Sequence, residues 1–312
     1  MNFEINQNEV LTPPVDAASV MLLRDSPQGL QVLLVKRHSQ SRVLGGAYVF
    51  PGGKLDKQDC LVEPALLDQP AQALQQALGE PGLDRATACG LHVAALRETF
   101  EECDVLLHAA QANDARAQRQ RLREHLAAGK PFLPSLSALG LGPLQTRLIR
   151  PWSRWITPRR PSMIDRRFDT RFFIAVAPEG QEARQDGHET TEALWLTPRQ
   201  AIERYWQDRL PLVPVQLITL MQINRLERAE QAMQAARSQT PIQIQPEPQD
   251  IDGQRVLCYP GDPSHAVQQA AWEGPTRLVY RNGRFEPSEG GLQALFDGGL
   301  RPHGPISPSH LK

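Results

Sequence analysis

Hydrophobic residues near the start of the chain form two short runs separated by a turn-rich stretch. The runs cover residues 18–23 and 30–35, and Asp25-Ser26-Pro27-Gln28-Gly29 lies between them. Continuous apolar runs of this length, bounded by turn residues, are typical of buried strands. The pattern therefore predicts a buried hairpin that begins a central sheet.

Further along, helical and strand-like patterns alternate. Pro81-Gly82 separates a helical segment at 61–80 from a second helix that Asp84 or Thr87 is predicted to cap. The later segments are a helix at 114–128, strands at 152–156, 171–177 and 193–196, and helices at 198–207 and 215–236. This mixture predicts an α/β fold, an α/β/α sandwich with a mixed sheet.

The composition changes near residue 237. Residues 237–254 are rich in Pro, Gln and Asp, which is typical of a linker, so the main domain is predicted to span 14–236. Residues 255–312 form a small C-terminal extension of unknown role. It contains a strong hairpin signal at Asn282-Gly283, between Arg277–Tyr280 and Arg284–Glu286.

Charge and composition exclude several classes of protein. The 312 residues are 40% hydrophobic and carry a net charge of −1, which argues against a general nucleic-acid or membrane-surface binder. No apolar stretch reaches the length of a membrane span, the N-terminus lacks a signal peptide, and the four cysteines lack zinc spacing. The chain ends in Leu311-Lys312 without a terminal Ser-Lys-Leu. We expect a cytoplasmic protein with no nucleic-acid or membrane partner, and the oligomeric state stays open.

The strongest candidate for chemistry is the stretch Arg97-Glu98-Thr99-Phe100-Glu101-Glu102. In a helix, Glu98, Glu101 and Glu102 share one face, where like charges repel. A divalent cation would relieve that repulsion, and Mg²⁺ is often held by one or two carboxylates together with substrate phosphate oxygens. Arg97 could hold a carboxylate in a bidentate grip and fix its orientation. A solvated acidic helix face is the alternative interpretation of this stretch alone.

The upstream turn Phe50-Pro51-Gly52-Gly53 strengthens the functional interpretation. It follows a strand-like segment at 47–49, and its two glycines can let backbone approach a ligand closely. Gly52 and Gly53 are therefore predicted to contact substrate. A glycine turn together with an acidic helix indicates a magnesium site for cleaving a diphosphate.

These two motifs resemble the signature of the Nudix hydrolase family. Gly53 matches the first glycine of that signature, and the Arg97 helix matches its charged half. The sequence departs from the pattern at several positions: 44 positions separate Gly53 from Arg97 where the family has 14, Asp59 replaces a glutamate, Thr99 replaces an apolar residue, and Asp104 replaces the late glycine.

The interruption itself resembles a branch of the family, the peroxisomal-type coenzyme A diphosphatases. That branch carries a comparable insertion, here predicted as a helical excursion at about 57–86 that shapes the pocket. The resemblance implies a hydrolase that uses Mg²⁺ or Mn²⁺ on Glu98, Glu101 and Glu102. The implied reaction is cleavage of coenzyme A or acyl-CoA, a nucleotide diphosphate substrate, to 3′,5′-ADP and (acyl-)4′-phosphopantetheine.

Other predicted site residues lie outside these two motifs. Glu189, Glu192 and His188 are candidate general bases, with Glu189 preferred. Arg37 and Arg42 are candidates for gripping substrate phosphates. Trp152 and Trp155 could stack on adenine, but their strand spacing predicts that they do not share a face, and core packing is expected for at least one.

Two alternatives remain open at this stage. The first is a Nudix diphosphatase acting on ADP-ribose, NADH or another nucleotide. The second is a non-catalytic nucleotide-sensing module that uses the fold only to bind. Intact Glu98, Glu101 and Glu102 count against the second alternative, because a pure binder gains nothing from crowding three carboxylates on one face.

Overall fold

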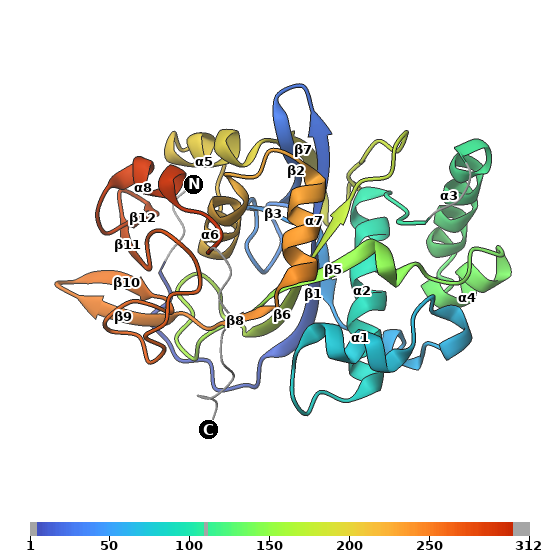
Figure 1. Cartoon of the computed structure of the whole chain (residues 1–312), viewed down its shortest axis with the longest axis horizontal. Helices are drawn as coiled ribbons and strands as arrows, with labels where there is room; N and C mark the ends of the chain where they lie inside the picture. The colour runs from blue at the N-terminus through green and yellow to red at the C-terminus, as the bar shows by residue number, and fades with distance from the viewer. Residues whose placement is uncertain (1–4, 109–111, 302–312) are drawn as a thin grey trace.

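A mixed β-sheet forms the centre of the molecule (Figure 1). The structure is a computed structural model that describes residues 5–108 and 112–301, with no side-chain description for 112–115. Within these ranges one sheet has eight strands in the order β3-β2-β1-β6-β5-β8, with β4 paired to β1 and β7 paired to β2. Its strands are β1 (Val15–Ser26), β2 (Gly29–Arg37), β3 (Tyr48–Val49), β4 (Gly52–Lys54), β5 (Ile149–Ile156), β6 (Phe168–Val176), β7 (Thr190–Leu196) and β8 (Ile242–Ile244). The predicted hairpin is confirmed as β1 and β2, which pair antiparallel.

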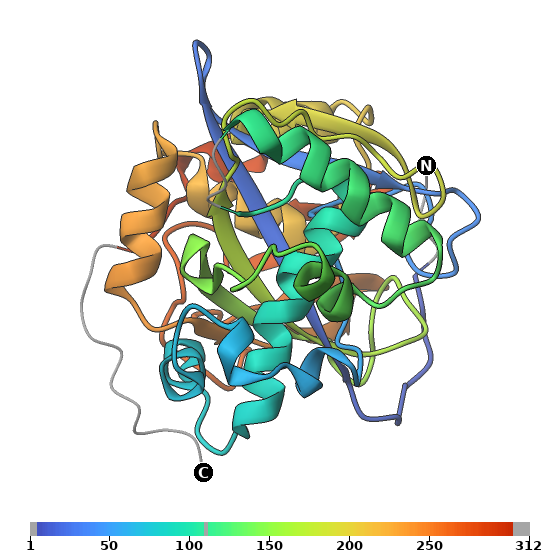
Figure 2. The same ribbon diagram turned by 90° about the vertical axis from the view of Figure 1, so that its right-hand side faces the viewer.

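Helices cover both faces of this sheet (Figures 1 and 2). One face packs against α1 (Ala71–Leu78), α2 (Arg85–Cys103), α3 (Ala112–Ala127) and α4 (Phe132–Ala138). The other packs against α5 (Pro198–Trp206), α6 (Pro214–Ile223) and α7 (Ala229–Ser238). Each face has its own hydrophobic cluster because successive strand residues point to opposite sides. The predicted α/β/α sandwich is confirmed.

Helix α2 runs across its face of the sheet and is buried over most of its length (Figure 2). Asp84 caps its N-terminus, as predicted, and accepts hydrogen bonds from the Thr87 backbone NH at 2.9 Å and the Thr87 hydroxyl at 2.7 Å. Asp104 ends it in the left-handed region at φ 56°, where a glycine would be favoured. Arg119 and Arg123 of α3 form ion pairs with the Asp104 carboxylate.

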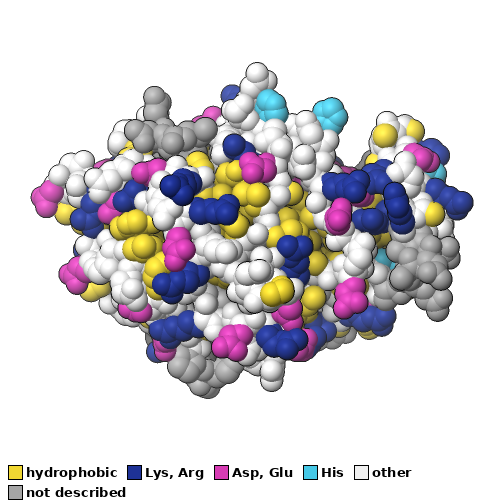
Figure 3. Space-filling view, turned by 90° about the horizontal axis from the view of Figure 1, so that it is seen from above, with side chains coloured by type: hydrophobic (Ala, Val, Ile, Leu, Met, Phe, Trp, Pro, Cys, Tyr) yellow, Lys and Arg dark blue, Asp and Glu magenta, His cyan; other side chains and the backbone are white. Residues whose placement is uncertain are grey.

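Helix α3 has a polar surface, and Lys and Arg side chains gather over it in the space-filling view (Figure 3). Its buried contact with the core comes from Leu122. The contacts with Asp104 attach this polar helix to the C-terminal end of α2.

The insertion between β4 and α2 is only partly helical. The helix predicted at 61–80 forms over Ala71–Leu78 alone, preceded by the 3₁₀ turns η1 (Asp59–Leu61) and η2 (Pro64–Leu66). Pro64 and Pro70 lie at the starts of η2 and α1, because proline fits the first turn of a helix and not its interior. Leu74 and Leu78 are buried in the cluster that α2 also joins. The insertion therefore packs against α2.

The single helix predicted at 215–236 is wrong, because two helices form with a break at residues 224–228. Asn224 ends α6, and α7 begins after Arg228. Asp25 of β1 accepts a hydrogen bond from the Ala229 backbone NH at 2.7 Å and pairs with Arg228 at 3.0 Å. A carboxylate at this helix start satisfies an exposed NH group and favours a new N-terminus there.

The C-terminal residues form a second sheet that packs against the first domain. β8 pairs with β5 in parallel, and β9 (Glu247–Ile251), β10 (Gln254–Cys258), β11 (Arg277–Arg281) and β12 (Arg284–Pro287) form the second sheet, followed by α8 (Gly291–Asp297). Strands β8 and β9 thus lie within the predicted linker at 237–254. The hairpin at Asn282-Gly283 is confirmed, with φ values of 54° and 76°.

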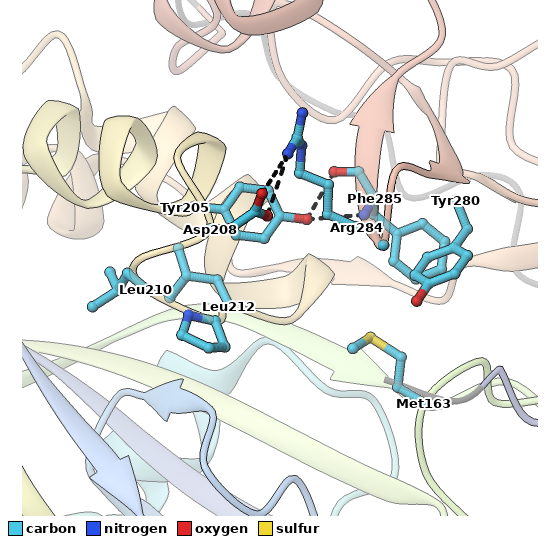
Figure 4. Close-up of a pocket in the computed structure, with 10 residues that line it drawn as sticks. Met163, Tyr205, Asp208, Leu210, Leu212, Tyr280, Arg284 and Phe285 are labelled. Carbon is cyan, nitrogen blue, oxygen red and sulfur yellow. Dashed lines mark hydrogen bonds and ion pairs between the residues drawn. The ribbon is translucent and has the colours of Figure 1, made fainter. Parts of the chain in front are cut away.

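Tyr205 of α5 attaches this second sheet to the core (Figure 4). Its hydroxyl donates to the Phe285 carbonyl at 2.8 Å and accepts from the Phe285 backbone NH at 2.9 Å. Arg284 pairs with Asp208 at 3.3 Å and lies over the Trp206 ring. Buried Leu257, Leu278 and Phe285 belong to the same hydrophobic cluster as α5 and α6. The C-terminal sheet therefore shares a core with the main sheet.

None of the helices within the described ranges is both long enough and apolar enough to span a bilayer.

Candidate active site

Strand β4 brings the two glycines of the Phe50-Pro51-Gly52-Gly53 turn against β1 and α2. A Cβ at Gly52 would lie 2.4 Å from the Ala18 carbonyl oxygen, and a Cβ at Gly53 would lie 2.3 Å from Glu98 Oε1. Any side chain at Gly53 would displace the carboxylate. The glycines therefore allow the acidic helix to lie directly on β4.

Glu102 connects α2 to this turn. Its Oε2 accepts a hydrogen bond from the Gly52 backbone NH at 2.9 Å, while its Oε1 is buried and has no hydrogen-bond partner. Burial, with the nearby Glu98 carboxylate, raises the pKa of Glu102 to about 8. A buried carboxylate oxygen with no donor is costly unless it binds a proton or a cation.

Arg97 is the centre of the ionic network. Its Nε and Nη2 donate to the two Asp59 carboxylate oxygens at 3.0 and 2.9 Å, and Nη2 also donates to the Lys54 carbonyl at 3.1 Å. Its Nη1 donates to Glu98 Oε1 at 2.8 Å and to Glu101 Oε2 at 2.9 Å. The bidentate grip falls on Asp59, and single bonds orient Glu98 and Glu101.

The three helix carboxylates have a donor set suited to a hard divalent cation. Burial raises the pKa of Glu98 to about 7 and also raises that of Glu101. Over the described ranges, no three His, Cys, Asp or Glu side chains already converge as metal ligands. Glu98 and Glu101 instead form ion pairs with Arg97. The unpartnered Oε1 of Glu102 and the raised pKa values fit oxygen ligands that a cation would stabilise in their charged form.

One open cleft brings most of the predicted site residues together. Its lining includes Arg37, Arg42, Gly52, Gly53, Arg97, Glu98, Glu101 and Glu189. Glu102 lies behind this lining and reaches it through the Gly52 backbone NH. The lining includes no residue of the insertion at 57–86, which contradicts the expectation that the insertion shapes the pocket. The insertion packs against α2, and its contact with the site is the Asp59 carboxylate, which accepts hydrogen bonds from Arg97.

The three candidate bases differ in their surroundings. Glu189 and His188 line the cleft, in the loop between β6 and β7. Asp186 accepts a hydrogen bond from the Glu189 backbone NH at 3.1 Å, which shapes this loop. Glu192 accepts a hydrogen bond from the Tyr48 hydroxyl at 2.6 Å and does not line the cleft. The geometry therefore favours Glu189 over Glu192.

Trp152 and Trp155 do share a face, contrary to the prediction from their spacing. The pairing of β5 with β6 shifts register between Pro151 and Ser153, which marks a bulge at Trp152. An extra residue in the strand changes the alternation of faces, so both indoles join the same cluster. Core packing is confirmed for both, with 3% and 6% of their surfaces exposed.

Some residues of the cleft carried no signal in the sequence. Pro246 of the predicted linker and Leu257 and Tyr259 of the C-terminal extension line it, together with Met163 and Ile164 of the β5–β6 connection. Pro246, Leu257 and Tyr259 reach the cleft because β8 pairs with β5 and brings the following chain alongside it. Long-range strand pairing of this kind is not visible in local patterns.

Comparison with known proteins decides the family. A family model described as the NUDT19 Nudix domain matches residues 65–225. The chain belongs to the NUDT19 branch of the Nudix hydrolases. The resemblance drawn from the glycine turn and the acidic helix is thereby confirmed, and the chain is a Nudix hydrolase.

Several curated relatives carry the name acyl-coenzyme A diphosphatase NUDT19. The Gallus gallus protein is 29% identical over 260 residues, covering 67% of this chain and 67% of its own length. The Xenopus laevis protein is 25% identical over 228 residues, covering 62% of this chain and 59% of its own length. The match thus spans 59% to 67% of the length of these two relatives.

A solved structure supports the fold. The crystal structure of a NUDIX hydrolase from Alicyclobacillus acidocaldarius has a TM-score of 0.54 and 29% sequence identity, and the match covers 74% of this chain and 99% of that chain. The sheet and its covering helices are therefore those of the Nudix fold.

Proposed function

We propose that this Nudix hydrolase cleaves the diphosphate of coenzyme A or acyl-CoA, giving 3′,5′-ADP and (acyl-)4′-phosphopantetheine. The observation that carries the proposal is a single cleft that joins carboxylates from α2, Arg37 of β2, Arg42 of the β2–β3 connection and an apolar wall. The names of the NUDT19 relatives point to the same substrate class.

The α2 carboxylates would hold the divalent cation, Mg²⁺ or Mn²⁺. Glu98, Glu101 and Glu102 supply the oxygen ligands that such ions prefer. When bound, the cation would polarise a phosphoryl oxygen and lower the pKa of a water. Arg97 positions Glu98 and Glu101 by hydrogen bonds, and Asp59 holds Arg97 in place by accepting hydrogen bonds from it.

The other cleft residues would bind and activate the reactants. Arg37 and Arg42 would neutralise substrate phosphate groups, since guanidinium groups match phosphate oxygens in geometry. The Arg37 Nε donates to the Val43 carbonyl at 3.1 Å, which holds this arginine at the end of β2 against the β2–β3 connection. Glu189 would accept the proton of the attacking water.

A substrate panel tests the proposal. Purified protein is incubated with Mg²⁺ and, separately, coenzyme A, octanoyl-CoA, ADP-ribose, NADH and a nucleoside triphosphate, and kcat/KM is measured for each. The proposal expects the highest kcat/KM for the two coenzyme A species and no turnover with EDTA. A higher kcat/KM for ADP-ribose, NADH or the triphosphate would refute coenzyme A as the substrate class but would still be consistent with a Nudix hydrolase.

A further inference from the structure

The cleft has two chemically different ends. Charged groups of β4, α2 and the β2–β3 connection line one end, as described above. The other end, at β5 and β6, is lined by apolar side chains that include Trp155, Met163, Ile164, Phe168, Pro246, Leu257 and Tyr259. A substrate that fills the whole cleft therefore has a charged part and an apolar part.

Strand register gives the separation of the two ends. Lys54 of β4 pairs with Ala17 of β1, Ala17 pairs with Thr170 of β6, and Thr170 pairs with Trp155 of β5. Three steps between neighbouring strands span roughly 14 Å. This distance exceeds the reach of a diphosphate itself and suits a long chain attached to it.

Trp155 and Tyr259 at the apolar end do not offer a free ring face for adenine. Trp155 stacks on Trp272 with centroids 6.4 Å apart and an interplanar angle of 15°, and Tyr259 meets both rings edge-on. Trp155 is 6% exposed and Tyr259 is fully buried, so protein covers their faces. The remaining wall is largely aliphatic, which favours a flexible apolar chain over a stacked base.

The predicted linker and the C-terminal extension supply part of this wall. Pro246 follows β8 by two residues, and Leu257 belongs to β10. The Nudix domain match ends at residue 225, so both residues lie beyond the family's matched region. The sheet β9–β12 is attached to the core by Tyr205, which holds Leu257 and its neighbours against the cleft.

We propose that the C-terminal extension, together with the preceding residues 237–254, is a specificity element, in which Pro246 and Leu257 contact the acyl-pantetheine arm of the substrate. This inference rests on the proposed function, because it assigns the arm of the same substrate to the apolar end. Its consequence is that changes at this wall alter discrimination between acyl-CoA and substrates whose second arm is polar, such as ADP-ribose. Chemistry at the α2 carboxylates would be unaffected.

Two matched substitutions on β10 test the role of the wall. Leu257→Ala removes apolar surface from the cleft, whereas Val256→Ala removes it from the opposite face of the same strand, where Val256 packs in a separate small cluster. We expect Leu257→Ala to raise KM for octanoyl-CoA. The ratio of kcat/KM for octanoyl-CoA to kcat/KM for ADP-ribose should therefore fall about tenfold. Val256→Ala should keep the substrate ratio within about twofold.

A second pair avoids the buried strand. Pro246→Asp places a carboxylate at the half-buried edge of the apolar wall, and Pro248→Asp places one at a half-buried proline that does not line the cleft. Only Pro246→Asp should weaken binding of octanoyl-CoA, measured by calorimetry in EDTA, by about tenfold or more, with little effect on 3′,5′-ADP.

The two sets of results separate the inference from the proposed function. If the wild type cleaves no coenzyme A species, the proposed function fails, and octanoyl-CoA binding in EDTA still decides whether Pro246 and Leu257 contact the arm. If the wild type cleaves acyl-CoA but both cleft variants keep the wild-type substrate ratio and the wild-type octanoyl-CoA affinity, the role of the extension is refuted. Thermal denaturation of each variant identifies losses caused by unfolding.

Discussion

Arg97 grips Asp59 through two parallel hydrogen bonds, from Nε to Oδ1 at 3.0 Å and from Nη2 to Oδ2 at 2.9 Å. Both residues are buried, with 7% and 3% of their surfaces exposed. Asp59 belongs to the insertion, and Arg97 contacts the α2 carboxylates Glu98 and Glu101. The insertion thus contacts Arg97 of the acidic helix through Asp59 and does not line the cleft.

Asp59→Asn should lower turnover about ten- to a hundredfold. Loss of the anionic partner frees Arg97 to bind Glu98 and Glu101 more tightly, which withdraws those carboxylates from a cation. Steady-state kinetics over a Mg²⁺ titration checks this, with a rise in the Mg²⁺ concentration for half-maximal rate. Asp56→Asn is the matched control, because Asp56 lies 3.7 Å from Arg97 and is largely exposed. Equal activity of the two variants would contradict the role of Asp59.

Glu101→Gln and Glu102→Gln should each reduce turnover at least about a hundredfold with the fold retained. Each removes a negative oxygen ligand from the proposed cation site. Turnover is compared with circular dichroism of the same samples. Glu203→Gln, on the distant α5, serves as the control, since Glu203 pairs with Arg199 on the same helix. Wild-type turnover in both α2 variants would refute the proposed cation site.

Glu189→Gln should cause the largest loss among the three candidate bases, about a hundredfold or more in kcat. His188→Gln leaves the carboxylate in place, and Glu192→Gln changes a group that is bonded to Tyr48 and does not line the cleft. The three variants are assayed together at saturating Mg²⁺. A greater loss in His188→Gln or Glu192→Gln than in Glu189→Gln would transfer the role to that residue.

Activity should fall as the pH drops below about 8. Burial raises the pKa of Glu98 to about 7 and that of Glu102 to about 8, so protons compete with the cation for these oxygens in that range. The Mg²⁺ concentration for half-maximal rate should rise steadily from pH 8.5 to pH 6.5. A value independent of pH across this interval would contradict the assignment of these carboxylates as ligands.

The same carboxylates should make the metal-free protein less stable at higher pH. A glutamate whose folded-state pKa is raised binds its proton more tightly when folded, so stability is lost as pH rises from about 4.5 through the folded pKa. Glu102→Gln stays uncharged and should therefore unfold at a higher temperature than the wild type in EDTA at pH 8.5, with the difference vanishing near pH 4.5. Equal melting temperatures at pH 8.5 would show that Glu102 is not strained when ionised.

Local patterns predicted much of the fold because they depend on neighbouring residues. Asp84 caps α2, and Asn282-Gly283 turns the C-terminal hairpin, as their residue types require. The glycine turn and the acidic helix were also visible, and the structure brings them together although Gly53 and Arg97 are 44 positions apart in the sequence. Here the resemblance to a known family supplied a pairing that spacing alone does not give.

Features that depend on tertiary contacts were not predictable. The Asp25 carboxylate that starts α7 comes from β1, far away in the sequence. The bulge at Trp152 inverted the expected faces of β5, because alternation assumes a regular strand. Leu257 reaches the cleft only through the pairing of β8 with β5 and the docking of the second sheet.

The most direct test is mass-spectrometric identification of the products formed from coenzyme A and octanoyl-CoA with Mg²⁺, with Glu102→Gln protein in parallel. We predict 3′,5′-ADP together with 4′-phosphopantetheine or its octanoyl derivative in the wild-type reaction, and a strong reduction of both in the variant. Intact substrate in the wild-type reaction, or products released equally by Glu102→Gln, would contradict it.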